Sequence, residues 1–184
     1  MNLKENKILD KAYVIARTVM SQQDFYLSED CNANHKQLLE TMIGAAIWYL
    51  PQDKELWTGD ISIGALKKLF ESDNPKKIKL TKDHHYPRKV SAAELFKLNW
   101  LTFSNPAEEV LHRYQNIYGR FNFVLPEENK SLVKYQKGHV FVNPEDSYRQ
   151  ACIELRKISQ EQLNRIRKGD RKLAEMAMMN QLKV

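Results

Sequence analysis

Glycine and cysteine are both scarce in this chain of 184 residues, which has six glycines and two cysteines. So few glycines make a glycine-rich loop that cradles phosphate unexpected, and neither a Walker-type loop nor a Rossmann glycine pattern is present. A nucleophile elbow and an HExxH motif are also missing. These absences argue against nucleotide-dependent and acyl-transfer chemistry.

The two cysteines, Cys31 and Cys152, lie far apart and match neither a disulfide framework nor a zinc-ligand spacing. Two free thiols are typical of a reducing compartment. The first residues lack the apolar stretch of a signal peptide, and the most apolar run, Met42 to Leu50, is about half the length that spans a bilayer. We therefore expect a cytoplasmic protein that does not enter membranes.

What the chain does have is a surplus of positive charge, with 29 Lys and Arg against 23 Asp and Glu, a net charge of +6. Such a surplus attracts polyanions, of which nucleic acid is the commonest. Hydrophobic residues make up 42% and charged residues 28%, as in ordinary globular proteins. The length predicts a single domain, residues 1–184, and leaves room for a second small one.

Apolar periodicity predicts a mainly α (α+β) protein. Residues 1–72 form an expected helical layer, in which Ile8, Ala12, Ile15, Ala16 and Val19 share one helical face and Asn32 or Asn34 caps the second helix. After a turn, a short strand is expected from Lys76, and RFNFVLP predicts a second strand. The expected centre is therefore a small β-hairpin with a helical insertion between its strands.

The second strand is followed by an expected helix over residues 126–136, because Pro126 and two glutamates suit a first helical turn. Residues 138–142 predict a short strand or extended piece. Residues 143–184 predict C-terminal helices, one running to about Lys168 and a last one over 171–182.

The segment Asp83-His84-His85-Tyr86-Pro87 follows the first predicted strand, Asn122 lies in the second, and Asn129 lies in the first turn of the next helix. In these features the chain resembles the HNH, or His-Me finger, endonuclease superfamily, whose first motif is often Asp-His-aliphatic-x-Pro. The resemblance implies that residues 77–137 form a ββα-metal nuclease core.

By this resemblance, His84 is the general base, Asp83 and Asn129 hold the metal ion, and Asn122 ties the loop after the first strand to the second strand. A histidine near its intrinsic pKa can take a proton from water at neutral pH. Carboxylate and amide oxygens suit Mg²⁺ or Mn²⁺, which stabilises charge on the leaving oxygen of a phosphodiester.

The chain departs from the family pattern at several points. His85 stands where an aliphatic residue is usual and is a candidate third metal ligand. No cysteine lies between Asn122 and Asn129, so no structural zinc is implied. Glu128 is a rival metal ligand, and Asn116 is a rival structural asparagine.

Basic residues flank the motif. Arg88 and Lys89 follow it, and Lys82 precedes it; together with His85 they are the expected contacts to nucleic acid, because arginine binds two phosphate oxygens at once. Two longer basic runs could follow a phosphate backbone. They are Lys76 to Lys82 and Arg156 to Lys172.

The expected function is therefore metal-dependent endonuclease cleavage of nucleic acid, with DNA as the expected substrate and His84 as general base. The alternative is a non-enzymatic, basic nucleic-acid-binding or regulatory protein. A weaker third option is a metal-independent ribonuclease that uses His84 and His85 as acid and base. Many site-specific nucleases are dimers, which makes a homodimer the assembly to consider.

Overall fold

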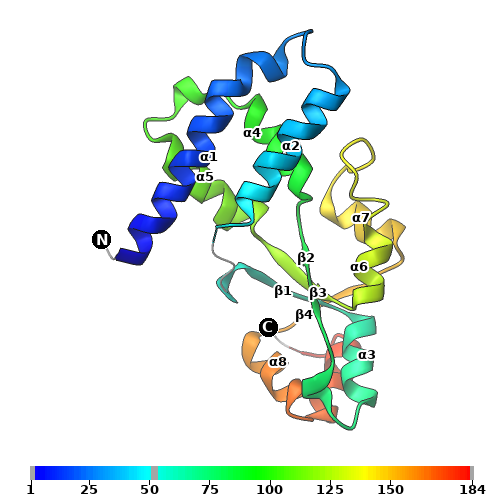
Figure 1. Cartoon of the computed structure of the whole chain (residues 1–184). Helices are drawn as coiled ribbons and strands as arrows, with labels where there is room; N and C mark the ends of the chain where they lie inside the picture. The colour runs from blue at the N-terminus through cyan, green and yellow to red at the C-terminus, as the bar shows by residue number, and fades with distance from the viewer. Residues whose placement is uncertain (1–2, 51–53, 183–184) are drawn as a thin grey trace. The chain divides into compact units, whose positions relative to one another are not determined.

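A computed structural model of the chain describes residues 3–50 and 54–182. These residues gather into two compact units, each built from two stretches of chain (Figure 1). Residues 1–56 and 84–120 form the first unit, and residues 57–83 and 121–184 form the second. The expected helical layer and the expected nuclease core are thus each divided between the two units.

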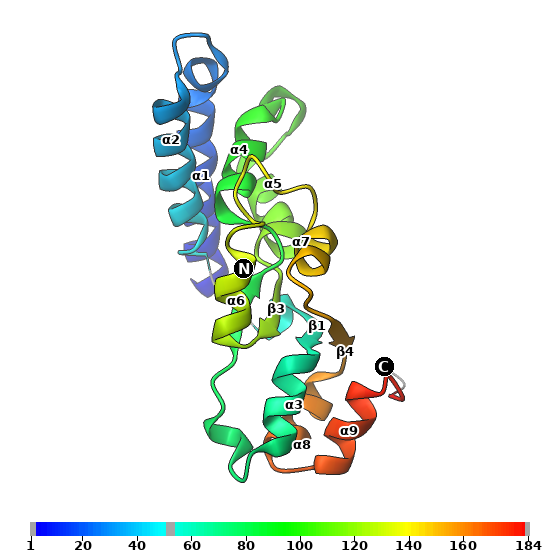
Figure 2. The ribbon, with the colours of Figure 1, turned by 90° about the vertical axis from the view of Figure 1, so that its right-hand side faces the viewer.

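The first unit is helical, and its long helix α1 packs against α2, α4 and α5 (Figure 2). Its elements are α1 (Leu3–Leu27), α2 (Ala33–Ile47), η1 (Lys54–Leu56), α4 (Arg88–Lys97), η3 (Trp100–Thr102), α5 (Pro106–Arg113) and the π-helical turn η4 (Tyr114–Tyr118).

Local sequence accounts for the first helices. Ala12, Ile15, Ala16 and Val19 are all buried, so the predicted apolar face of α1 is confirmed. The side chain of Asn32 accepts hydrogen bonds from the backbone of Asn34 and His35, which confirms Asn32 as the cap of α2.

The second unit contains a four-stranded mixed sheet with the order β2-β3-β1-β4. Strand β1 pairs in parallel with β3 and antiparallel with β4. Its elements are β1 (Trp57–Ser62), α3 (Ile63–Glu71), η2 (Pro75–Lys77), β2 (Thr81–His84), β3 (Phe121–Val124), α6 (Pro126–Leu132), α7 (Pro144–Gln150), β4 (Leu155–Lys157), α8 (Gln160–Arg167) and α9 (Arg171–Met178). The last residue of β2, His84, is counted with the first unit.

Helices dominate the described chain, and the sheet is small, so the α+β class is confirmed. The strand predicted from RFNFVLP is present as β3, whereas β2 begins at Thr81, five residues later than expected. Helix α6 starts at Pro126 as predicted and ends early, at Leu132. Among the described residues, no helix has the length and apolar character needed to cross a membrane.

Three predictions about the elements are wrong. Residues 57–62 form a strand within the expected helical layer, residues 138–142 form a turn and loop without a strand, and β4 interrupts the helix expected over 143–168. Helix α7 stops because Cys152 adopts a left-handed backbone conformation, with φ at 55°. The two missed strands pair with each other across about 100 residues, and short-range periodicity carries no sign of such pairing.

Candidate functional site

Asp83 is the only acidic side chain of the described chain that is buried, with 3% of its surface exposed. It lies near the end of β2 and accepts a hydrogen bond from the hydroxyl of Tyr148. The side-chain amide of Gln136 donates to both carboxylate oxygens, each at 3.1 Å. Three donated bonds therefore compensate for the burial of this carboxylate.

Burial raises the pKa of Asp83 to about 6, although the hydrogen bonds from Tyr148 and Gln136 act in the opposite direction. The pKa of Tyr148 is also raised, first by its own burial and then by the charge of Asp83. At neutral pH, Asp83 is therefore an ionised carboxylate held by a neutral phenol.

Asn122 is fully buried in β3. Its side-chain oxygen accepts a hydrogen bond of 2.5 Å from the Thr58 hydroxyl on β1, and its side chain also acts on Tyr148, whose pKa it lowers. By the resemblance, the side chain of Asn122 was expected to bind the loop after the first predicted strand. The hydrogen bond from Thr58 connects it to the neighbouring strand β1. Asn122 thus links two strands of the sheet.

His84 follows Asp83 directly but contacts different residues, as expected for successive side chains of a strand. Its imidazole lies against the indole of Trp48, with ring centroids 4.0 Å apart. The guanidinium of Arg88 lies 4.5 Å from the centroid of the same indole. The indole of Trp48 therefore contacts both His84, the predicted general base, and Arg88, a predicted phosphate contact.

Close packing of α2 on α4 brings Trp48 and Arg88 together. A Cβ atom on Gly44 of α2 would lie 2.9 Å from the carbonyl oxygen of Arg88, which is closer than side chains tolerate. Only glycine at this position lets the start of α4 approach α2 so closely.

The other expected nucleic-acid contacts are dispersed. Arg88 and Lys89 are exposed in the first turn of α4, and the backbone N–H of His85 donates to the carbonyl of Arg120. In the second unit, the ammonium of Lys82 lies 4.5 Å from the ring centroid of Phe121.

Glu128 and Asn129, both near the start of α6, are the two residues that the sequence offers as second metal ligand. One carboxylate oxygen of Glu128 accepts from the Ser62 hydroxyl at 2.5 Å and from the backbone N–H of Leu125 at 2.7 Å. Gly64 leaves room for this carboxylate, since a Cβ there would lie 2.2 Å from it. Glu128 is therefore occupied as a helix cap, while no side-chain hydrogen bond of Asn129 exists among the described residues.

Asn116, the rival structural asparagine, donates its side-chain amide to the carbonyl of His112 one helical turn away. That bond is local to the helix and links no strand. Of the two candidates, Asn122 is therefore the asparagine whose side chain connects two strands of the sheet.

The donor chemistry of Asp83 and Asn129 fits a hard divalent ion. Magnesium is usually bound through one or two carboxylates and completed by water and phosphate oxygens. An ionised carboxylate offers about four lone-pair positions, of which Tyr148 and Gln136 use three, so one remains. Within the part of the chain that the structure describes, no three His, Cys, Asp or Glu side chains gather into a metal-binding group.

Four residues that contact predicted site residues within the same unit were not predicted from the sequence: Trp48, Thr58, Gln136 and Tyr148. Gln136 and Tyr148 lie 53 and 65 positions from Asp83, and Thr58 lies 64 positions from Asn122. No motif spacing connects residues so far apart. A buried aspartate does demand donors, but only the fold identifies them.

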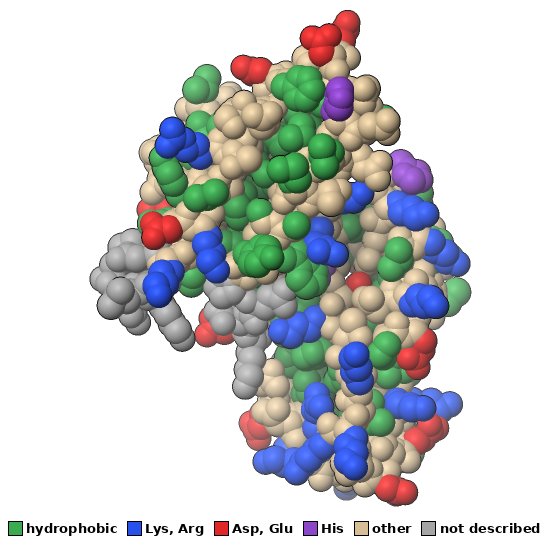
Figure 3. Space-filling model, in the orientation of Figure 1, with side chains coloured by type: hydrophobic (Ala, Val, Ile, Leu, Met, Phe, Trp, Pro, Cys, Tyr) green, Lys and Arg blue, Asp and Glu red, His purple; other side chains and the backbone are tan. Residues whose placement is uncertain are grey.

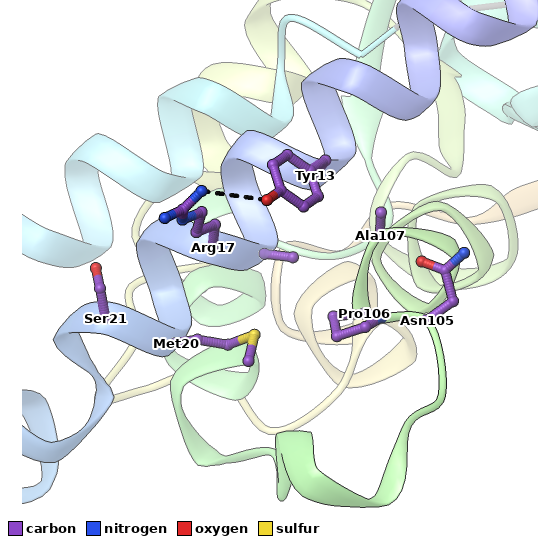
Figure 4. A pocket seen from close by; sticks show the side chains of 8 residues that line it. Tyr13, Arg17, Met20, Ser21, Asn105, Pro106 and Ala107 are labelled. Carbon is purple, nitrogen blue, oxygen red and sulfur yellow. Dashed lines mark hydrogen bonds between the residues drawn. The ribbon is translucent and has the colours of Figure 1, made fainter.

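A separate pocket of about 500 Å³ lies in the first unit between α1 and the start of α5 (Figure 4). Arg17 donates to the hydroxyl of Tyr13 beside it, and the thioether of Met20 points toward Pro106. Its lining is mainly apolar and includes none of the predicted site residues. The predicted chemistry is therefore not located in this pocket.

Comparison of the chain with known proteins gives no relative from which a function could be inferred. No family model, no curated protein and no solved structure matches the chain.

Proposed function

We propose that this chain is a metal-dependent endonuclease that hydrolyses phosphodiester bonds of nucleic acid, with DNA as the substrate. The observation that carries the proposal is the order of elements around Asp83 and His84. These residues end β2, the neighbouring strand β3 carries the buried Asn122, and α6 follows β3 at once with Asn129 in its first turns. A ββα nuclease core requires this order.

In the proposed reaction, His84 takes the proton of the attacking water, and its contact with Trp48 limits the rotation of the imidazole. Asp83 and Asn129 would be the protein ligands of Mg²⁺ or Mn²⁺, which when bound supplies charge neutralisation at the leaving oxygen. Arg88, exposed beside Trp48, is available to bind the scissile phosphate.

The decisive experiment compares wild type with His84→Ala on plasmid DNA and on labelled single-stranded and double-stranded DNA and RNA, with Mg²⁺, Mn²⁺ or EDTA. We expect wild type to cut only with metal, and His84→Ala to lose at least about 100-fold in rate. His112→Ala, an exposed histidine of the same unit, is the control and should cut normally.

Each contrary result has a definite meaning. Equal rates for His84→Ala and wild type would refute the proposal, as would a wild type that cuts no substrate with either metal. Cleavage of RNA that persists in EDTA would favour the metal-independent ribonuclease with His84 and His85.

The burial of Asp83 favours a second candidate function. A carboxylate that is 3% exposed and bound by Tyr148 and Gln136 also suits a purely structural role. If the role of Asp83 is structural, the second candidate function is that of a basic protein that binds nucleic acid without cutting it. Tight binding by wild type, unchanged in His84→Ala and without cleavage in either metal, would identify that function.

A further inference from the structure

Positive charge is divided unequally between the two units. The first unit contains 11 Lys and Arg and 11 Asp and Glu residues, so its formal charges cancel. The second contains 18 Lys and Arg against 12 Asp and Glu, and therefore carries the whole net charge of +6. A polyanion is consequently attracted to the second unit.

Within the second unit, the fold joins two basic runs that lie about 90 residues apart in sequence. The guanidinium of Arg167, in the last residue of α8, donates to the carbonyl of Lys76 in η2 at 3.0 Å. The guanidinium of Arg171, in the first residue of α9, lies 3.2 Å from the carboxylate of Asp73. The loop containing η2 is thus fastened to the junction of α8 and α9.

The surface around this junction is exposed and basic. Helix α3 contacts η2, α8 and α9, so its outer face borders the same region. Figure 3 shows Lys and Arg side chains gathered over the part of the second unit that contains α3, α8 and the η2 loop. We call it the η2–α8 surface and define it by exposed lysines whose side chains make no hydrogen bond or ion pair with the residues that the structure describes. They are Lys68, Lys76, Lys77, Lys168 and Lys172.

Three acidic groups near the junction are already paired. Asp73 faces Arg171, Glu71 faces Lys67, and Asp170 binds Arg165. None of these ion pairs includes a lysine of the η2–α8 surface, although the charge of Lys172 helps to lower the pKa of Asp170. The ammonium groups of these lysines are point charges on long stems, which suits contact with successive phosphates and not with particular bases.

We propose that the η2–α8 surface binds the phosphate backbone of nucleic acid and is the main source of affinity for it. This inference rests on the proposed function, which supplies nucleic acid as the partner, and it assigns binding to residues outside the expected set of Lys82, His85, Arg88 and Lys89. Binding at this surface depends on charge and is therefore weak in sequence preference and strong in salt dependence.

The test compares the triple variant Lys76→Gln/Lys77→Gln/Lys168→Gln with wild type. The matched control Lys7→Gln/Lys11→Gln/Lys97→Gln removes the same charge from exposed lysines of the first unit. Binding to a fluorescent DNA duplex is measured by anisotropy in EDTA at several salt concentrations, so that cleavage plays no part. Arg167 and Arg171 are left intact because they hold the loop and helices together.

We expect the η2–α8 variant to lose at least about tenfold in affinity at low salt and its salt slope to fall by about 2 to 3. The control should remain within about threefold of wild type. Equal losses in both variants, or an unchanged salt slope in the η2–α8 variant, would overturn the assignment. Wild type that binds vesicles of anionic lipid and no nucleic acid would also overturn it.

The nuclease proposal and the proposal for the η2–α8 surface can be refuted independently of each other. Loss of duplex binding in the η2–α8 variant, in a protein that never cleaves, would support the surface and refute the nuclease. Normal cleavage with an unchanged salt slope would support the nuclease and refute the surface.

Discussion

The indole of Trp48 lies against the imidazole of His84, with ring centroids 4.0 Å apart and ring planes inclined at 58°. The two residues are 36 positions apart in sequence and come from the end of α2 and the end of β2. The guanidinium of Arg88 shares the same indole. This cluster gives the predicted general base a fixed aromatic neighbour.

Replacing Trp48 tests whether that neighbour orients the base. We expect Trp48→Ala to lower kcat by about 10- to 100-fold with a smaller change in KM, because a misdirected base acts on the reaction and not on substrate binding. Trp48→Phe, which keeps an aromatic face, should retain most of the activity. Circular dichroism and Tm verify that both variants fold. A kcat of Trp48→Ala equal to that of wild type would show that the ring contact has no role in catalysis.

The raised pKa of Asp83 predicts that the stability of the protein depends on pH. Its pKa is raised to about 6, so the folded protein binds its proton more tightly than the unfolded chain does. The free energy of unfolding contributed by this group is therefore greatest below about pH 4 and falls by about 3 kcal/mol as pH rises to about 6. In Asp83→Asn that fall is absent, so the variant gains stability relative to wild type across this range.

Urea unfolding in metal-free buffer from pH 4 to pH 7.5 measures this difference. Asp170→Asn is the control, because a hydrogen bond from the backbone of Leu173 and the guanidinium of Arg165 lower the pKa of Asp170. This carboxyl titrates below about pH 4 in both the folded and the unfolded chain, so the stability of Asp170→Asn relative to wild type should stay nearly constant from about pH 5 to pH 7.5. A constant difference between Asp83→Asn and wild type would contradict the raised pKa of Asp83.

The identity of the second metal ligand is tested by paired variants in α6. Glu128 caps the helix through Leu125 and binds Ser62, so we expect Glu128→Gln to cost about 1 kcal/mol of stability and to leave the metal requirement unchanged. Asn129→Ala should instead raise the Mg²⁺ concentration for half-maximal cleavage, with Tm nearly constant. The reverse pattern would make Glu128 the ligand.

Local features of this chain were predictable because their causes are local. The buried face of α1 follows from apolar residues at helical spacing, the start of α2 follows from Asn32, and β3 follows from an apolar run bounded by Gly119 and Pro126. The sequence likewise placed Asp83, Asn122 and Asn129 on or beside the elements that carry them in the structure, although the predicted strand started five residues before β2 does.

Pairing between distant segments was not predictable in this way. Strands β1 and β4 exist because they pair with each other and, for β1, with β3, and these partners lie far apart in sequence. Three residues such as Leu155 to Lys157 have no stable extended form without a neighbouring strand to satisfy their backbone groups. The interruption of the long C-terminal helix therefore became visible only in the fold.

By itself, the sequence determined the chemistry available to this protein: an Asp-His pair, two asparagines in the order of a ββα core, a net charge of +6 and helices of definite face and cap. The tertiary structure decided the neighbours of those groups. In the folded chain, Asp83 is buried against Tyr148 and Gln136, and the imidazole of His84 packs against the indole of Trp48. Folding also brings together the two distant basic runs that form the η2–α8 surface. Burial and contact depend on segments brought together by folding, and side-chain spacing along the chain does not encode them.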